Sequence, residues 1–87
     1  MRILMQPIEM IAWFTREGIP NPIRYRLTSG NDSHVVVKVD HVVTRSEEKL
    51  AGNRMLIFRC QSEINGLIKQ YELKYELNTC KWYLHKL

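Results

Sequence analysis

The segment 67–77 (LIKQYELKYEL) alternates between apolar and polar side chains with a period of two residues. A β-strand sends successive side chains to opposite faces, whereas a helix would scatter these residues around its circumference. One face of the predicted strand carries Leu67, Tyr71, Leu73, Tyr75 and Leu77. We expect this apolar set to point into a core and the opposite set, Glu72, Lys74 and Glu76, to face solvent.

The same period recurs between clusters of turn-forming residues along the chain. Residues 65–66 (Asn-Gly) are the strongest of these signals, because both residue types accept a positive φ in a hairpin turn. The pattern predicts six strands, at 7–15, 22–28, 34–43, 54–63, 67–77 and 81–86. The segment 44–52 is open to two interpretations. It is either a short helical turn near 46–51, capped by Ser46, or an irregular loop.

Consecutive strands joined by short turns form an antiparallel meander. Six strands with one apolar face cannot stay flat in water, so the sheet must curl over itself or pack on a partner. We therefore predict an all-β fold, a single domain over 1–87 that curls into a small SH3-like or OB-like barrel.

The composition limits the class of protein. The chain has 87 residues, of which 45% are hydrophobic and 25% charged, as in an ordinary globular domain. It has two cysteines, no recognisable export signal and no apolar run approaching the ~18 residues of a membrane helix. These features predict a cytoplasmic protein that does not associate with membranes.

Motifs for catalysis or metal binding are not evident in the sequence. The histidines and cysteines lack ligand spacing, and Asp40 and His41 are neighbours in a strand and so point to opposite faces. Cys60 alternates with apolar residues and is expected in the core, whereas Cys80 follows a turn and is expected near the surface. We predict a non-enzymatic protein with no catalytic residues, no metal site and no cofactor.

The formal net charge is +4, and several of the cations alternate outward from predicted strands. Arg24 and Arg26 project from one strand, Lys38 from the next, and Tyr83 from the last. Cations beside an exposed ring suit single-stranded nucleic acid, since charge follows the phosphates and rings stack on bases. These residues are the predicted nucleic-acid site, and the alternative is that they are ordinary solvated charges on the outside of a sheet.

The segment 10–14 (MIAWF) is apolar on both faces of its predicted strand. Either another segment of the chain covers the outer face, or Ile11 and Trp13 form an interface. In the second case the protein would bind a protein partner or form a homodimer.

Four segments together resemble a family of small bacterial all-β proteins without an assigned activity. They are Pro20 to Arg26, Val39 to Val42, Tyr71 to Leu73 and Trp82 to His85. The resemblance spans most of the chain but leaves out residues 44–53, which look like an insertion. Some members of that family are encoded beside lesion-bypass DNA polymerases. The resemblance thus implies a small β fold and favours a binding module for nucleic acid or for a nucleic-acid-handling protein.

Overall fold

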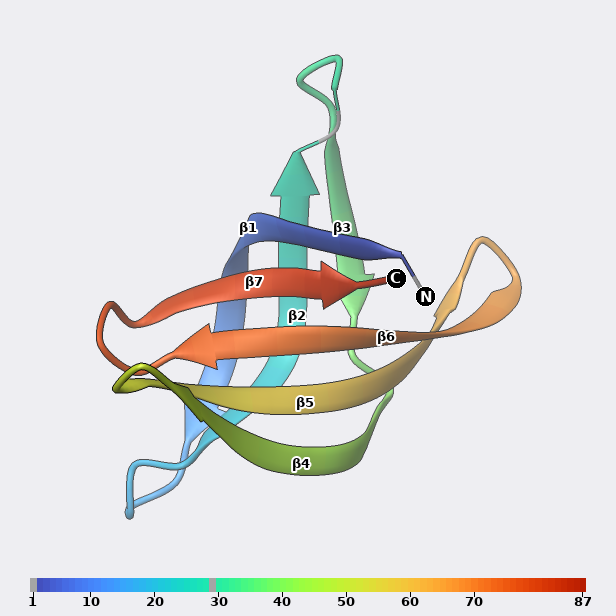
Figure 1. Ribbon diagram of the computed structural model, residues 1–87. Helices are drawn as coiled ribbons and strands as arrows, with labels where there is room; N and C mark the ends of the chain where they lie inside the picture. Colours follow the sequence, from blue (N-terminus) through green and yellow to red (C-terminus); the bar gives the residue numbers. More distant parts are fainter. Residues whose placement is uncertain (1, 29) are drawn as a thin grey trace.

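A computed structural model describes residues 2–28 and 30–87 as one antiparallel sheet (Figure 1). Its strands are β1 (Ile3–Phe14), β2 (Pro20–Thr28), β3 (His34–Lys38), β4 (His41–Leu50), β5 (Asn53–Ile64), β6 (Leu67–Glu76) and β7 (Lys81–Lys86). Their spatial order is β3-β2-β1-β7-β6-β5-β4. The all-β antiparallel prediction is confirmed, with seven strands in place of six.

Strand β1 belongs to two parts of the sheet. Its residues 3–8 pair with β7 and its residues 9–14 with β2, and the register with β2 shifts between Ile11 and Ala12. We call β4 to β7 with the first half of β1 the large section, and β2, β3 and the second half of β1 the small section. Figure 1 shows β2 and β3 running across the direction of β5, β6 and β7. The sheet is therefore curled into a half-barrel, with β3 and β4 as its two edges.

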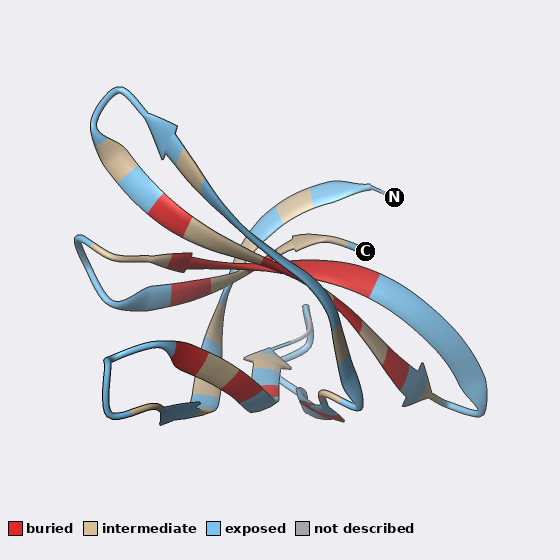
Figure 2. Ribbon diagram, turned by 90° about the horizontal axis from the view of Figure 1, so that it is seen from below, coloured by how far each residue is buried: buried red, intermediate tan, exposed pale blue. Residues whose placement is uncertain are grey.

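The core lies between the facing sides of the two sections. The small section contributes Tyr25 and Val37, and the large section contributes Phe58, Cys60, Tyr71, Leu73, Tyr75, Trp82 and Leu84. The rings of Tyr25 and Tyr71 meet edge to face across the interior, with centroids 5.6 Å apart. Figure 2 shows burial in the middle of the strands and exposure at the hairpin ends. The predicted burial of Tyr71, Leu73, Tyr75 and Cys60 is confirmed.

Two predictions about β6 are wrong. Leu67, expected in the core, is 62% exposed because it pairs with Ile64 at the end of the hairpin, beyond the core. Glu72 and Lys74, expected in solvent, are only 8% and 7% exposed. Strand β6 lies inside the sheet, so long side chains from the strands on both sides pack over its outer face.

The predicted strand at 34–43 is two strands, and residues 46–50 belong to a strand, with Ala51 in the turn that follows it. The chain turns between Lys38 and His41, and β4 then pairs with β5 up to Leu50. Ser46 lies opposite Ile57 in that ladder, so it caps no helix. Cross-strand pairing has here overridden the local preference of a Glu- and Lys-rich segment for helix. The turn at Asn65-Gly66 is present, with φ of 52° and 79°.

Candidate nucleic-acid interface

The outer face of the small section gathers both groups of candidate residues. The strand register sends to this face Glu9, Ile11, Trp13, Arg24, Arg26, His34, Val36 and Lys38, together with Asn21 and Thr28. The predicted apolar interface and most of the predicted basic site thus share one surface. We call it the β1–β2–β3 face.

The strand register sets the neighbours on this face. Arg24 lies between Ile11 on β1 and Lys38 on β3 in one row across the strands. Arg26 lies between Glu9 and Val36 in the next row. A groove of about 440 Å³ runs between the two rows, and its outer walls include Ile11, Arg24 and Val36. The groove therefore sets the apolar side chains of Ile11 and Val36 beside the guanidinium groups of Arg24 and Arg26.

Trp13 is the most exposed aromatic side chain on the β1–β2–β3 face, with 68% of its surface accessible. It follows Ile11 on the same side of β1, and Ile11 is 62% exposed. Both residues point outward, and no described segment covers them. An exposed indole on a rigid strand provides a flat apolar surface on which another ring can stack.

The cations of this face differ in their partners. Arg26 donates to Glu9, with Nη2 and Nε lying 2.6 and 2.8 Å from Oε1, so its charge is largely compensated. Arg24 and Lys38 are both exposed, and neither forms an ion pair with a carboxylate in the described part of the chain. Two adjacent uncompensated cations raise the local positive potential.

A buried hydrogen-bond network fixes the end of β3 that carries Lys38. The Ser62 hydroxyl donates to the carbonyl oxygen of Lys38 at 2.6 Å, and the Tyr71 hydroxyl lies 2.6 Å from Ser62 Oγ. Burial raises the pKa of Tyr71 to about 12, so this phenol stays neutral and can donate to Ser62. The network joins the small section to the large one and holds Lys38 beside Arg24.

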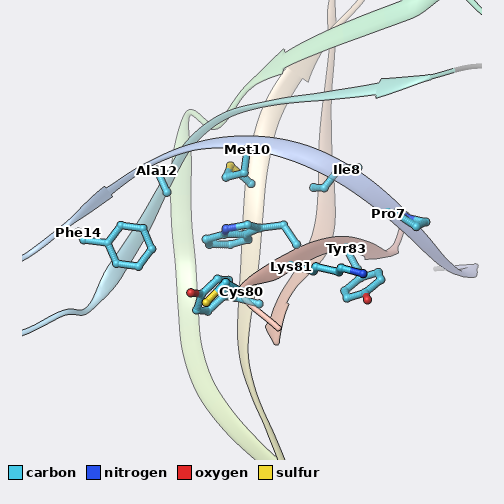
Figure 3. A pocket seen from close by; sticks show the side chains of 10 residues that line it. Pro7, Ile8, Met10, Ala12, Phe14, Cys80, Lys81 and Tyr83 are labelled. Atoms are coloured by element: carbon cyan, nitrogen blue, oxygen red, sulfur yellow. The ribbon is translucent and has the colours of Figure 1, made fainter. Parts of the chain in front are cut away.

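Tyr83 lies outside the β1–β2–β3 face. It is half-buried on β7, between Pro7 and Lys74 in the ladders of the large section. It lines a different cavity, of about 680 Å³, whose other walls include Phe14 and Trp82 (Figure 3). The structure thus brings Arg24, Arg26 and Lys38 together with Ile11 and Trp13, and it places Tyr83 past the bend of β1.

The hairpin of β1 and β2 shows why the sequence kept the two groups of residues apart. The turn through Gly18 makes β1 and β2 a hairpin, and any such hairpin brings the end of β1 beside the start of β2. Strict alternation from this turn would place Arg24 opposite Met10, on the other side from Trp13. The extra residue Ile23 in β2 shifts the register and brings Arg24 opposite Ile11, on the side of Trp13. Trp13, rather than Tyr83, is the aromatic residue that accompanies the cations.

Groups with acid–base or thiol chemistry lie elsewhere in the molecule. Burial raises the pKa of the Cys60 thiol to about 12, and Cys80 is exposed in the turn before β7. His85 Nδ1 lies 2.8 Å from Glu72 Oε1 on the large section. Over residues 2–28 and 30–87, no three His, Cys, Asp or Glu side chains are grouped to hold a metal ion. The described residues contain no helix that could cross a membrane.

No family model matches the sequence, and no curated protein or solved structure matches it either. The resemblance to small bacterial β proteins stays an expectation from the sequence. The case for a function depends on the geometry of the β1–β2–β3 face.

Proposed function

We propose that the protein is a non-enzymatic binding module that holds single-stranded nucleic acid on the β1–β2–β3 face. The observation that carries this proposal is the position of exposed Trp13 on the same face as two adjacent cations, Arg24 and Lys38, which have no described acidic partner. Charge and an exposed ring on one rigid sheet are the two features that sequence-tolerant single-strand binding needs.

Each residue of the face has a distinct part in this proposal. Arg24 and Lys38 contact phosphates, and Trp13 stacks on a base, a contact worth about 1–3 kcal/mol. Ile11 and Val36 line the groove beside them. Arg26 contributes less than Arg24, because a phosphate must compete with Glu9 for its guanidinium.

The test is fluorescence anisotropy of a labelled oligonucleotide, titrated at several salt concentrations. Affinity should fall as salt rises, with a slope of about −0.7 per phosphate contact on a single strand. The double variant Arg24→Gln with Lys38→Gln should weaken binding and flatten the slope, and Trp13→Ala should weaken binding at every salt concentration.

A matched control removes the same charge from elsewhere on the molecule. Lys49 and Lys69 are exposed on β4 and β6, away from the β1–β2–β3 face. The double variant Lys49→Gln with Lys69→Gln should bind almost as wild type does. Equal weakening by the two double variants would show that the β1–β2–β3 face is not the binding site. Absence of binding at low salt would refute the proposal altogether.

The same surface supports a second candidate, a protein-interaction or self-association module. The exposure of Ile11 and Trp13, both above 60%, favours it, because exposed apolar neighbours on a small domain commonly mark an interface. In that case Trp13→Glu should abolish association in sedimentation experiments while leaving the fold intact.

A further inference from the structure

Strand β3 is one edge of the sheet, and its hydrogen bonds to β2 show which of its backbone groups are free. Val39 N–H donates to Ile23 O at 2.9 Å, so Arg24 and Lys38 form a non-hydrogen-bonded pair in the antiparallel ladder. Tyr25 and Val37 are therefore a hydrogen-bonded pair. It follows by alternation that the N–H and C=O of Val36 point away from β2, along the open edge.

The centre of this edge lacks the features that normally prevent strand pairing, and its protection is confined to its five-residue length and to Lys38 at its end. Proteins protect exposed edges with proline, charged side chains or bulges. Strand β3 has the sequence HVVVK, and Val35 and Val36 at its centre are 42% and 58% exposed. No proline or bulge interrupts its ladder with β2.

The opposite edge, β4, is protected. Its exposed side chains include Arg45, Glu47 and Lys49, and its register with β5 shifts between Val42 and Thr44. Pairing of β3 with β4 of another copy would place the three valines against charges and a bulge. Such head-to-tail pairing could also continue without limit, whereas pairing of β3 with itself closes after two copies.

We propose that β3 pairs antiparallel with β3 of a second copy, about a two-fold axis at Val36. In this register Val36 faces Val36 of the second copy and Val35 faces Val37. His34 faces Lys38, so the two lysines do not oppose one another. Lys38 O already accepts the Ser62 hydroxyl, which limits the paired stretch to the length of β3. The occupant is a second copy because the valine-centred strand is complementary to itself in this register.

The dimer would form one continuous sheet from two copies and place two β1–β2–β3 faces side by side. The inference does not depend on the proposed function, because strand pairing uses the edge of β3 and nucleic acid would use its outer face. An experiment can therefore refute the proposed dimer without refuting the proposed nucleic-acid binding, and the reverse.

The first experiment measures the oligomeric state of the whole chain by sedimentation, without nucleic acid, over a range of micromolar concentrations. Wild type should be a dimer. Val36→Pro should weaken the dimer about tenfold or more, because it removes the N–H of Val36 from both copies. The bond between β2 and β3 does not use that N–H, so the variant should keep its fold. Val36→Thr keeps the N–H and should remain dimeric.

The second experiment tests the register directly and does not require proline to be tolerated. In a Cys80→Ser background, Val36→Cys should give a disulfide-linked dimer under mild oxidation, because two-fold pairing brings the Cα atoms to about 5.5 Å. Val35→Cys should not cross-link, since its symmetry mate lies on the diagonal at about 7–8 Å.

Three results would overturn the inference. They are a monomeric wild type at high concentration, a dimer unaffected by Val36→Pro, and equal cross-linking of the two cysteine variants. A dimer lost in Trp13→Glu but retained in Val36→Pro would also overturn it and would identify the β1–β2–β3 face itself as the interface.

Discussion

The outer faces of the two sections carry alternating charges in the same way along the sequence, yet the structure treats them differently. On the large section Glu72 lies between His85 and Arg59, and Lys74 donates to Glu48 at 3.1 Å. On the small section Arg24 and Lys38 remain exposed, without a described acidic partner. Charges in the middle of a wide section become part of the packing, whereas charges on a narrow one stay available for a ligand.

The largest expected loss of stability comes from a core residue of β6, compared with an exposed residue of the same strand. Leu73→Ala should lower the free energy of unfolding by about 2–5 kcal/mol, because Leu73 is fully buried between the sections. Leu67→Ala is the matched control on the same strand and should have little effect, since Leu67 is largely exposed. Urea denaturation of both variants measures this, and a loss near zero for Leu73→Ala would mean that the register of β6 is wrong.

A smaller loss of stability should distinguish the paired charges on the outer face of the large section from ordinary surface charges. Glu72→Ala removes the acceptor of His85 and Arg59, and leaving such partners unsatisfied costs about 1–3 kcal/mol. Glu63→Ala removes an exposed carboxylate of β5 and should cost less than about 0.5 kcal/mol. Thermal or urea unfolding compares them, and equal losses would remove the distinction between packed and free charges.

The pH dependence of stability sharpens the same comparison. Burial alone would raise the pKa of Glu72, but its hydrogen bond with His85, the nearby charge of Lys86 and contact with Arg59 together lower the pKa below its ordinary value of 4.5. The unfolded chain then binds a proton more readily than the folded one. The contribution of Glu72 is therefore complete above pH 4.5 and is lost as the pH falls through the lower folded pKa.

The measurement is urea unfolding at several pH values from about 6 down to the acid limit of folding. Glu72→Gln should lose less stability on acidification than wild type does, because its amide cannot be protonated in this range. Glu63→Gln serves as the control. A wild-type acid slope in Glu72→Gln would show that the pair does not contribute to acid sensitivity.

The smallest expected change in stability comes from removing the exposed cations of the small section. Arg24→Gln and Lys38→Gln should each change the free energy of unfolding by less than about 0.5 kcal/mol, because exposed side chains without partners contribute little to stability. Circular dichroism melts would measure this. Large losses would place these cations in the packing, as on the large section, and would weaken the case for a ligand there.

The sequence predicted much of the fold but only fragments of the site. Alternation identified the inner face of β6, and Asn65-Gly66 identified its hairpin, because both depend on neighbouring residues alone. The segment 46–51 was beyond such reasoning, since its helix-forming residues become a strand only through pairing with β5. The site was split in two for a similar reason, because the extra residue Ile23 in β2, which brings Arg24 opposite Ile11, does not show in a two-residue period.

The sequence by itself determined the β class, the inward row Tyr71, Leu73 and Tyr75, and the outward direction of Arg24, Lys38 and Trp13. Those properties follow from the two-residue period of a strand and from turn residues that accept a positive φ. Tertiary structure decided where β1 bends, which strands are edges, and which charges find partners. The burial of Glu72 and the freedom of Arg24 depend on the strands beside them, and an alternating pattern within one strand carries no information about those neighbours.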